Sequence, residues 1–169
     1  MTPTRTRTSP HGPHGRIAAR TWLSLVLLAG IAPALAADLS LQGQLAGGNV
    51  VSSTESAATG EVRAMLDDDG TLTVQMGYAG LGEDATGAAL HVGTISENGR
   101  KVADLPLPAT GAGGRIDTTL DLSDDDAGRV RAGEAYVQVS TLGHPDGAIR
   151  AQLMPQPVEL DDLPVPPEG

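Results

Sequence analysis

The sequence predicts an all-β domain, an antiparallel Greek-key sandwich or flattened barrel of about eight short strands with one short helical turn. Two observations predict this class. Apolar residues recur at every second position in many short runs, and stretches rich in glycine and aspartate separate the runs. The length fits one domain, because about 133 residues follow a leader predicted at 1–36. We expect the β domain to span residues 37–154.

The predicted strands are runs in which inward and outward positions alternate. A period of two indicates a strand with one buried face, because successive side chains point to opposite sides. Between two such runs, Asp67-Asp68-Asp69-Gly70 predicts a tight hairpin. The inward positions of five runs are Leu39, Leu41 and Leu45; Val62, Ala64 and Leu66; Leu72, Val74 and Met76; Ile116, Thr118 and Leu120; and Val137, Val139 and Thr141.

Three other segments complete the domain. Ser123 is a helix-capping residue, and Asp124–Asp126 place carboxylates where a helix N-terminus favours negative charge, so one helical turn is predicted that ends by Gly133. The run Gly111–Gly114 predicts a flexible connector. From Pro155 to Gly169 the chain contains five prolines among acidic residues, which predicts an extended or disordered tail.

The first 36 residues are predicted to be a secretory signal peptide. A basic stretch without acidic residues is followed by an apolar run from Trp22 to Ala32, then Pro33 and Ala34-Leu35-Ala36. The alternative is a transmembrane anchor, which needs about 20 apolar residues, roughly twice the length of this run. We therefore expect a protein exported to the periplasm or the extracellular medium, with no stable membrane anchor after cleavage.

The predicted mature chain is acidic and has no cysteine. Removing a leader with four basic and no acidic residues changes the formal net charge from −10 to −14. This charge disfavours nucleic acid and anionic lipid as partners and is compatible with hard cations. Without cysteine, the chain has no disulfide, no thiol chemistry and no lipid anchor on an N-terminal cysteine.

Two segments resemble the CHRD domain, a module named from the extracellular protein chordin and found in many exported bacterial proteins. Residues 86–93, TGAALHVG, with Glu97-Asn98-Gly99 and the strand at 101–105, resemble the family stretch AHIH.G…NG. Residues 133–141, GEAYVQVST, with 144–153, HPDGAIRAQL, resemble G..YVNVHT…P.GEIRGQL. With a looser match at 45–60, the resemblance covers about residues 39–154. It implies that a structural motif is formed by Gly93, Asn98, Gly99, Tyr136, Pro145, Gly147 and Arg150.

The chain departs from the family pattern at the histidines. The pattern has two histidines in the first motif and one in the second, and here Ala89 and Ser140 replace two of the three, leaving His91. Positions 89 and 91 share one face of a strand, as do 136, 138 and 140. If the two strands are close, a relative with all three imidazoles could gather them around a metal. That site cannot exist in this chain.

The remaining histidines suggest a different metal site. After cleavage only His91 and His144 remain, and Asp146 or another carboxylate could complete a copper or zinc site. The competing interpretation is that His91 hydrogen-bonds within a strand and His144 decorates a turn, since their spacing is not that of a known metal motif. The Asp67–Asp69 run lacks the spacing of a calcium loop and is better explained as a hairpin tip.

Arg150 is the notable charge of the second motif. A strand arginine after the turn Pro145-Asp146-Gly147 often pairs with a carboxylate through its planar fork. We therefore expect Arg150 to bridge to an acid on another strand and to have a structural role.

These observations favour an exported, non-enzymatic binding or interaction module whose partner is an unknown protein or a small ligand. No serine lies in a nucleophile-elbow pattern, and no phosphate-binding glycine loop is present. No cofactor is expected, apart from weakly bound copper or zinc. The alternative is a periplasmic metal-binding protein that uses His91 with His144 or a carboxylate. A third hypothesis is a subunit of a surface assembly that adds partners at its sheet edges.

Overall fold

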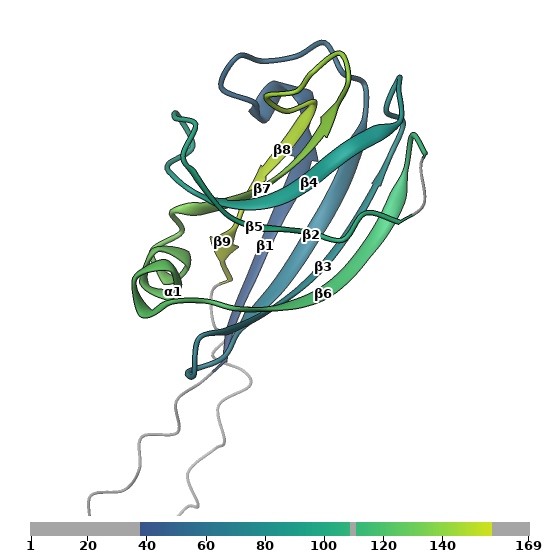
Figure 1. Cartoon of the computed structure of the whole chain (residues 1–169). Helices are drawn as coiled ribbons and strands as arrows, with labels where there is room; N and C mark the ends of the chain where they lie inside the picture. Colours follow the sequence, from purple (N-terminus) through teal and green to yellow (C-terminus); the bar gives the residue numbers. More distant parts are fainter. Residues whose placement is uncertain (1–37, 109–110, 157–169) are drawn as a thin grey trace, which may run out of the picture. The chain divides into compact units, whose positions relative to one another are not determined.

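Nine strands form one antiparallel sheet in the order β5-β4-β7-β8-β1-β2-β3-β6, with β9 also paired to β1 (Figure 1). The computed structural model describes residues 38–108 and 111–156, and the predicted signal peptide and most of the predicted tail lie outside the described residues. The elements are β1 Leu39–Ala46, η1 Gly47–Asn49, β2 Thr59–Leu66, β3 Thr71–Ala79, β4 Ala85–Val92, β5 Arg100–Asp104, β6 Gly114–Asp121, α1 Asp124–Arg131, β7 Ala135–Thr141, β8 Ile149–Gln152 and β9 Met154–Pro155.

The β1-β2-β3 meander follows directly from the alternating pattern. The three strands pair without a register shift from Leu39↔Leu66 to Thr59↔Ala79. The predicted hairpin between β2 and β3 is confirmed. Gly70 has a φ of +89°, which only glycine adopts easily, and an oxygen of Asp69 accepts a hydrogen bond from the Thr71 N–H at 3.0 Å. Hydrogen bonds from Thr71 lower the pKa of Asp69.

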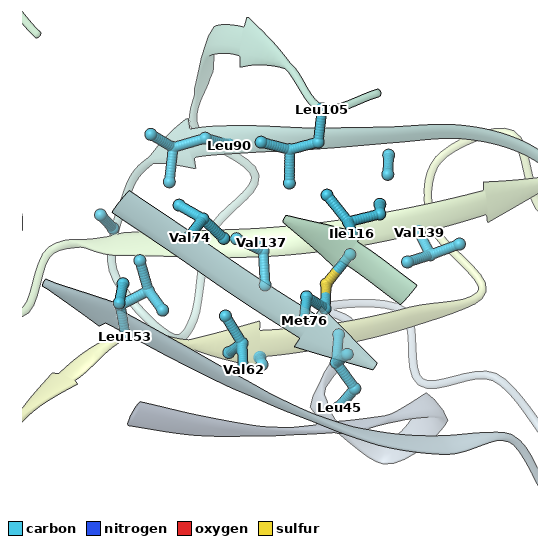
Figure 2. Close-up of a cluster of buried hydrophobic side chains, with 14 of the residues drawn as sticks. Leu45, Val62, Val74, Met76, Leu90, Leu105, Ile116, Val137, Val139 and Leu153 are labelled. Carbon is cyan, nitrogen blue, oxygen red and sulfur yellow. The ribbon is translucent and has the colours of Figure 1, made fainter. Parts of the chain in front are cut away.

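The sheet folds over so that its two halves face each other. The chain leaves β3 to form the β4–β5 hairpin, returns to pair β6 with β3, and crosses again through α1 to pair β7 with β4. Figure 2 shows the apolar side chains between the halves, with Leu90 and Leu105 on one side and Val74 and Met76 on the other. All four are at most 3% exposed. The all-β, barrel-like class predicted from the sequence is therefore confirmed.

The helix predicted after Ser123 is also confirmed. The hydroxyl oxygen of Ser123 accepts a hydrogen bond from the Asp126 N–H at 3.2 Å, and three aspartates occupy the first turn. Gly133, with a φ of +74°, turns the chain into β7. An ion pair between Arg100 and Asp126 joins β5 to the helix.

The last pairing reaches slightly further than the sequence predicted. Met154–Pro155 forms a two-residue strand beside Leu41 and Gln42, one residue into the segment expected to be a tail. The Gln156 N–H continues this pairing by donating to the Ser40 carbonyl at 2.8 Å. In the described part of the chain, no helix is long and apolar enough to cross a membrane.

Candidate functional site: a depression on strands β4 and β7

The two family-like segments form neighbouring strands. In β4 and β7, His91 lies opposite Tyr136, Ala89 opposite Gln138, and Gly87 opposite Ser140. On the other side of β7, Gln138 lies opposite Arg150 of β8. The expectation that these two strands are close, with positions 89 and 91 on one face, is confirmed.

The register also corrects the geometry suggested for the family's three histidines. Position 140 lies opposite Gly87, four residues along β4 from His91. Four residues span about 13 Å of strand, whereas two imidazoles that share one metal ion must come within a few ångströms of each other. A histidine at position 89 could therefore share a metal ion with either neighbour, but positions 91 and 140 lie at opposite ends of the row.

The β4–β5 loop, residues 93–99, covers part of the outer face of β7 and β8. The Gly99 N–H donates to the Tyr136 hydroxyl oxygen at 3.0 Å. The Gln152 amide donates to the carbonyls of Gly93 and Gly133, at 3.0 and 2.8 Å. Because of this cover, the predicted polar face of β7 is largely buried, and Tyr136 is only 1% exposed.

Arg150 binds this loop through backbone carbonyls, and not through a carboxylate. Its two terminal nitrogens donate to the carbonyl of Glu97 at 3.0 Å and to that of Thr94 at 2.7 Å. Its guanidinium carbon lies 3.4 Å from the centre of the Tyr136 ring, a cation–π contact.

The predicted bridge to an acid is wrong: among the described residues no carboxylate pairs with Arg150. The planar guanidinium group can donate to two loop carbonyls at once. No sequence pattern predicts such a pairing with backbone groups. The structural role of Arg150 is supported.

Close contacts and, at Gly147, a positive φ account for the three motif glycines. A Cβ on Gly99 would overlap the Val92 carbonyl oxygen, and one on Gly93 would come within 3.0 Å of the Gly99 Cα. Gly147 has a φ of +115°, and a Cβ there would come within 2.5 Å of the Gln138 side chain. The motif therefore lets the loop and the β7–β8 turn approach the sheet closely.

Beside the loop lies a cavity of about 370 Å³, which we call the β4–β7 depression. Its floor includes the small residues Gly87, Ala89 and Ser140. The other lining residues are Ala88, His91, Asn98, Gly99, Lys101, Asp104, Tyr136, Gln138, Pro145 and Asp146.

His91 lines the depression, and its surroundings favour the neutral form of the imidazole. Its ring stacks on Tyr136, with centroids 4.9 Å apart and planes 10° apart. Its Nδ1 lies 3.3 Å from the Gly99 carbonyl, which can only accept, so Nδ1 carries the hydrogen and Nε2 keeps a lone pair. Burial, followed by the positive charges of Arg150 and Lys101, lowers the pKa of His91, although Gly99 and Asp104 oppose this.

Two polar groups flank Ala89 across the sheet. Asp104 of β5 is its partner on one side, and Gln138 of β7 is its partner on the other. Gln138 is 8% exposed, and its Oε1 is buried with no hydrogen-bond partner in the described part of the chain. The ammonium of Lys101 contacts both oxygens of Asp104, at 2.8 and 3.0 Å.

The three predicted metal ligands are only partly brought together. His91 and Asp146 line the β4–β7 depression, whereas the exposed His144 lines two neighbouring depressions, one of which it shares with Asp146. The His144 backbone closes the β7–β8 turn, with its carbonyl accepting from the Gly147 N–H at 3.1 Å. Within residues 38–108 and 111–156, no group of three or more histidine, aspartate or glutamate side chains is placed to hold a metal.

Several residues of the site were not among the predicted ones. Lys101, Asp104 and Gln138 line the depression, and Gln152 supports the loop. Strand parity could have suggested Gln152, because it is two residues from Arg150 and shares its face. Asp104 could not be placed, because its position depends on an irregularity in the β4–β5 pairing between Leu90 and His91.

Comparison with known proteins identifies the family. The model of the CHRD domain matches residues 41–153, which include every strand of the sheet in whole or in part except β9. A search of curated proteins found no match, and neither did a search of solved structures. CHRD domains occur in secreted proteins as interaction modules. The match covers well over half of the sequence, and the chain therefore belongs to the CHRD domain family.

Proposed function

We propose that this chain is an exported, non-enzymatic binding module and that the β4–β7 depression is its binding site. The observation that carries the proposal is the cavity itself: both motif segments contribute to it, and its floor is Gly87, Ala89 and Ser140. Small residues beneath a rim of polar ones leave room for a ligand group and offer hydrogen bonds to orient it. Membership of a family of interaction modules supports the same assignment.

The arrangement of the lining residues favours binding over catalysis. Ser140 lies opposite Gly87, so it is separated from the His91 row by about 13 Å of strand and the two do not form a nucleophile–base pair. Lys101 is bound to Asp104. Tyr136, the aromatic residue of the site, is held between His91, Arg150 and the loop.

A matched pair of glycine variants tests the site. Gly87 and Gly77 are both half-buried strand glycines with no heavy atom within 4 Å of a built Cβ, but Gly77 lines a different depression. We expect Gly87→Phe to fill the β4–β7 depression and Gly77→Phe to leave it open. The measurement is saturation-transfer NMR with a set of small polar compounds. Compounds that bind the wild type should lose at least tenfold in affinity for Gly87→Phe only; binding that survives in Gly87→Phe, or turnover of a bound compound, would refute the proposal.

Metal binding remains a second candidate function because of the geometry of His91. Metal-bound histidines commonly donate their other ring N–H to a carbonyl, as Nδ1 does here toward Gly99. The lone pair of Nε2 is then available to bind a metal ion. The candidate predicts stoichiometric Cu(II) or Zn(II) binding in calorimetric titration that is lost in His91→Ala. With His144→Ala as the second variant, the experiment also asks whether that exposed histidine contributes. A wild-type protein that binds neither ion would end this hypothesis.

A further inference from the structure

We propose that the β4–β7 depression binds a primary ammonium group, which it places over Ala89 between Asp104 and Gln138. This inference rests on the proposed function and specifies its ligand. The two polar residues are the partners of Ala89 on the neighbouring strands, so their backbones are about 10 Å apart with only a methyl group between them. That space accepts a slender cationic group.

Several hydrogen-bond acceptors line this space. His91 presents an Nε2 lone pair, and Asp146 and Asp104 present carboxylates. The Gln138 side chain, more than nine-tenths buried, has an oxygen with no partner among the described residues, which is unfavourable in a protein interior. A half-turn of its terminal amide would bring that oxygen to the depression with little change in shape.

The charged ends of the two cationic side chains nearby are already engaged. Lys101 is bound to Asp104, and the terminal nitrogens of Arg150 are bound to loop carbonyls. A ligand that supplies donors would therefore complement the acceptors of the site. A primary ammonium has three N–H donors, no acceptor and a positive charge that suits the acidic chain, which carries 21 acidic against 11 basic residues.

The chain itself provides an ammonium at this rim. The Lys101 Nζ atom, on a side chain 53% exposed, lies 2.8 and 3.0 Å from the two oxygens of Asp104. Exposed pairs of this kind are weak, so an external amine can compete with Lys101 for Asp104. Lys101 is thus an internal competitor, and removing it should strengthen the binding of an external amine.

The test is an NMR titration of the purified ¹⁵N-labelled protein with n-butylammonium at low ionic strength. We expect shifts around Ala89 and in the Gln138 side-chain amide. Tetramethylammonium, which has the charge but no N–H donor, should bind at least fivefold more weakly. Equal binding of the two cations, or shifts confined to the Asp67–Asp69 turn, would overturn the proposal.

Three variants sharpen the result. Asp104→Asn should weaken n-butylammonium binding at least fivefold, and Lys101→Met should strengthen it at least threefold. Asp68→Asn, in the exposed β2–β3 turn, is the charge-matched control and should leave the affinity unchanged. An affinity that is the same in Asp104→Asn as in the wild type would refute the inference.

Two sources could present this ammonium in nature, a lysine side chain of a partner protein or a free amine. Nα-acetyllysine amide and putrescine represent them, and the tighter binder identifies the source. If neutral polar compounds bind the depression and are blocked by Gly87→Phe while amines do not bind, the proposed function stands and the ammonium inference fails.

Discussion

At the scale of single residues, Arg150 determines whether the β4–β5 loop stays on the sheet. It is 1% exposed and contacts two loop carbonyls and the face of Tyr136. A lysine keeps the charge but cannot span both carbonyls while lying flat on the ring. We expect Arg150→Lys to lower the free energy of unfolding by about 2 kcal/mol or more, because buried carbonyls lose charged partners.

Urea denaturation measures this effect, with Arg115→Lys as the control. Arg115 is an exposed residue of β6, and its replacement should change the free energy of unfolding by less than about 0.5 kcal/mol. Hydrogen exchange at the Gly99 amide, which donates to the Tyr136 hydroxyl, should also accelerate in Arg150→Lys. An Arg150→Lys variant as stable as the control would show that the loop does not depend on this side chain.

His91 gives stability a dependence on pH. Burial lowers its pKa below the ordinary value of 6.5, so the folded protein keeps the imidazole neutral where the unfolded chain binds a proton. The stability from this difference is fully present above pH 6.5 and is lost as the pH falls from there toward the lowered pKa.

We therefore expect the free energy of unfolding to fall between pH 7 and pH 5 more steeply in the wild type than in His91→Gln. Urea denaturation at several pH values measures both slopes. His144→Gln, which removes the exposed histidine of the β7–β8 turn, controls for the loss of an imidazole elsewhere. The explanation fails if His91→Gln keeps the wild-type slope.

At the scale of elements, the pairing of β4 with β7 decides which positions can act together. His91 and position 89 lie on the same face two residues apart, about 7 Å along the strand, whereas position 140 is opposite Gly87. Ala89→His should therefore create a two-imidazole site and bind Zn(II) at least tenfold more tightly than the wild type in calorimetric titration. Ser140→His alone should not, and a larger gain from Ser140→His would contradict the register.

Most of the strands could be predicted, because the alternation of apolar and polar residues is visible along the chain. Alternation located β1, β2, β3, β6 and β7, and turn residues located the β2–β3 hairpin and the start of α1. The partners of Arg150 were not predictable, because every residue carries a backbone carbonyl and the carbonyls of Thr94 and Glu97 leave no mark in composition. The depression was hidden for a related reason: it depends on the small size of Ala89 and Ser140 and on which strand lies beside them.

At the scale of the whole domain, one core joins the two halves of the folded sheet. Leu90 of β4 and Val74 of β3 are both fully buried in the same apolar cluster (Figure 2). Neither half covers its apolar face alone, so we expect the two halves to unfold together. Leu90→Ala should lower the free energy of unfolding by about 2–5 kcal/mol and destabilise both halves equally, whereas Leu142→Ala, at an 85% exposed position, should have little effect.

The two tyrosines provide the measurement, because they are the only ones in the chain and each reports on one half. Tyr78 lies in β3 and Tyr136 in β7 beside the depression. Fluorotyrosine labelling gives each a ¹⁹F resonance, and both folded signals should disappear at the same urea concentration, in the wild type and in Leu90→Ala. Separate midpoints would mean that the half containing the binding site opens while the β1-β2-β3 half stays folded, and the site would then be an independently mobile unit instead of part of a rigid domain.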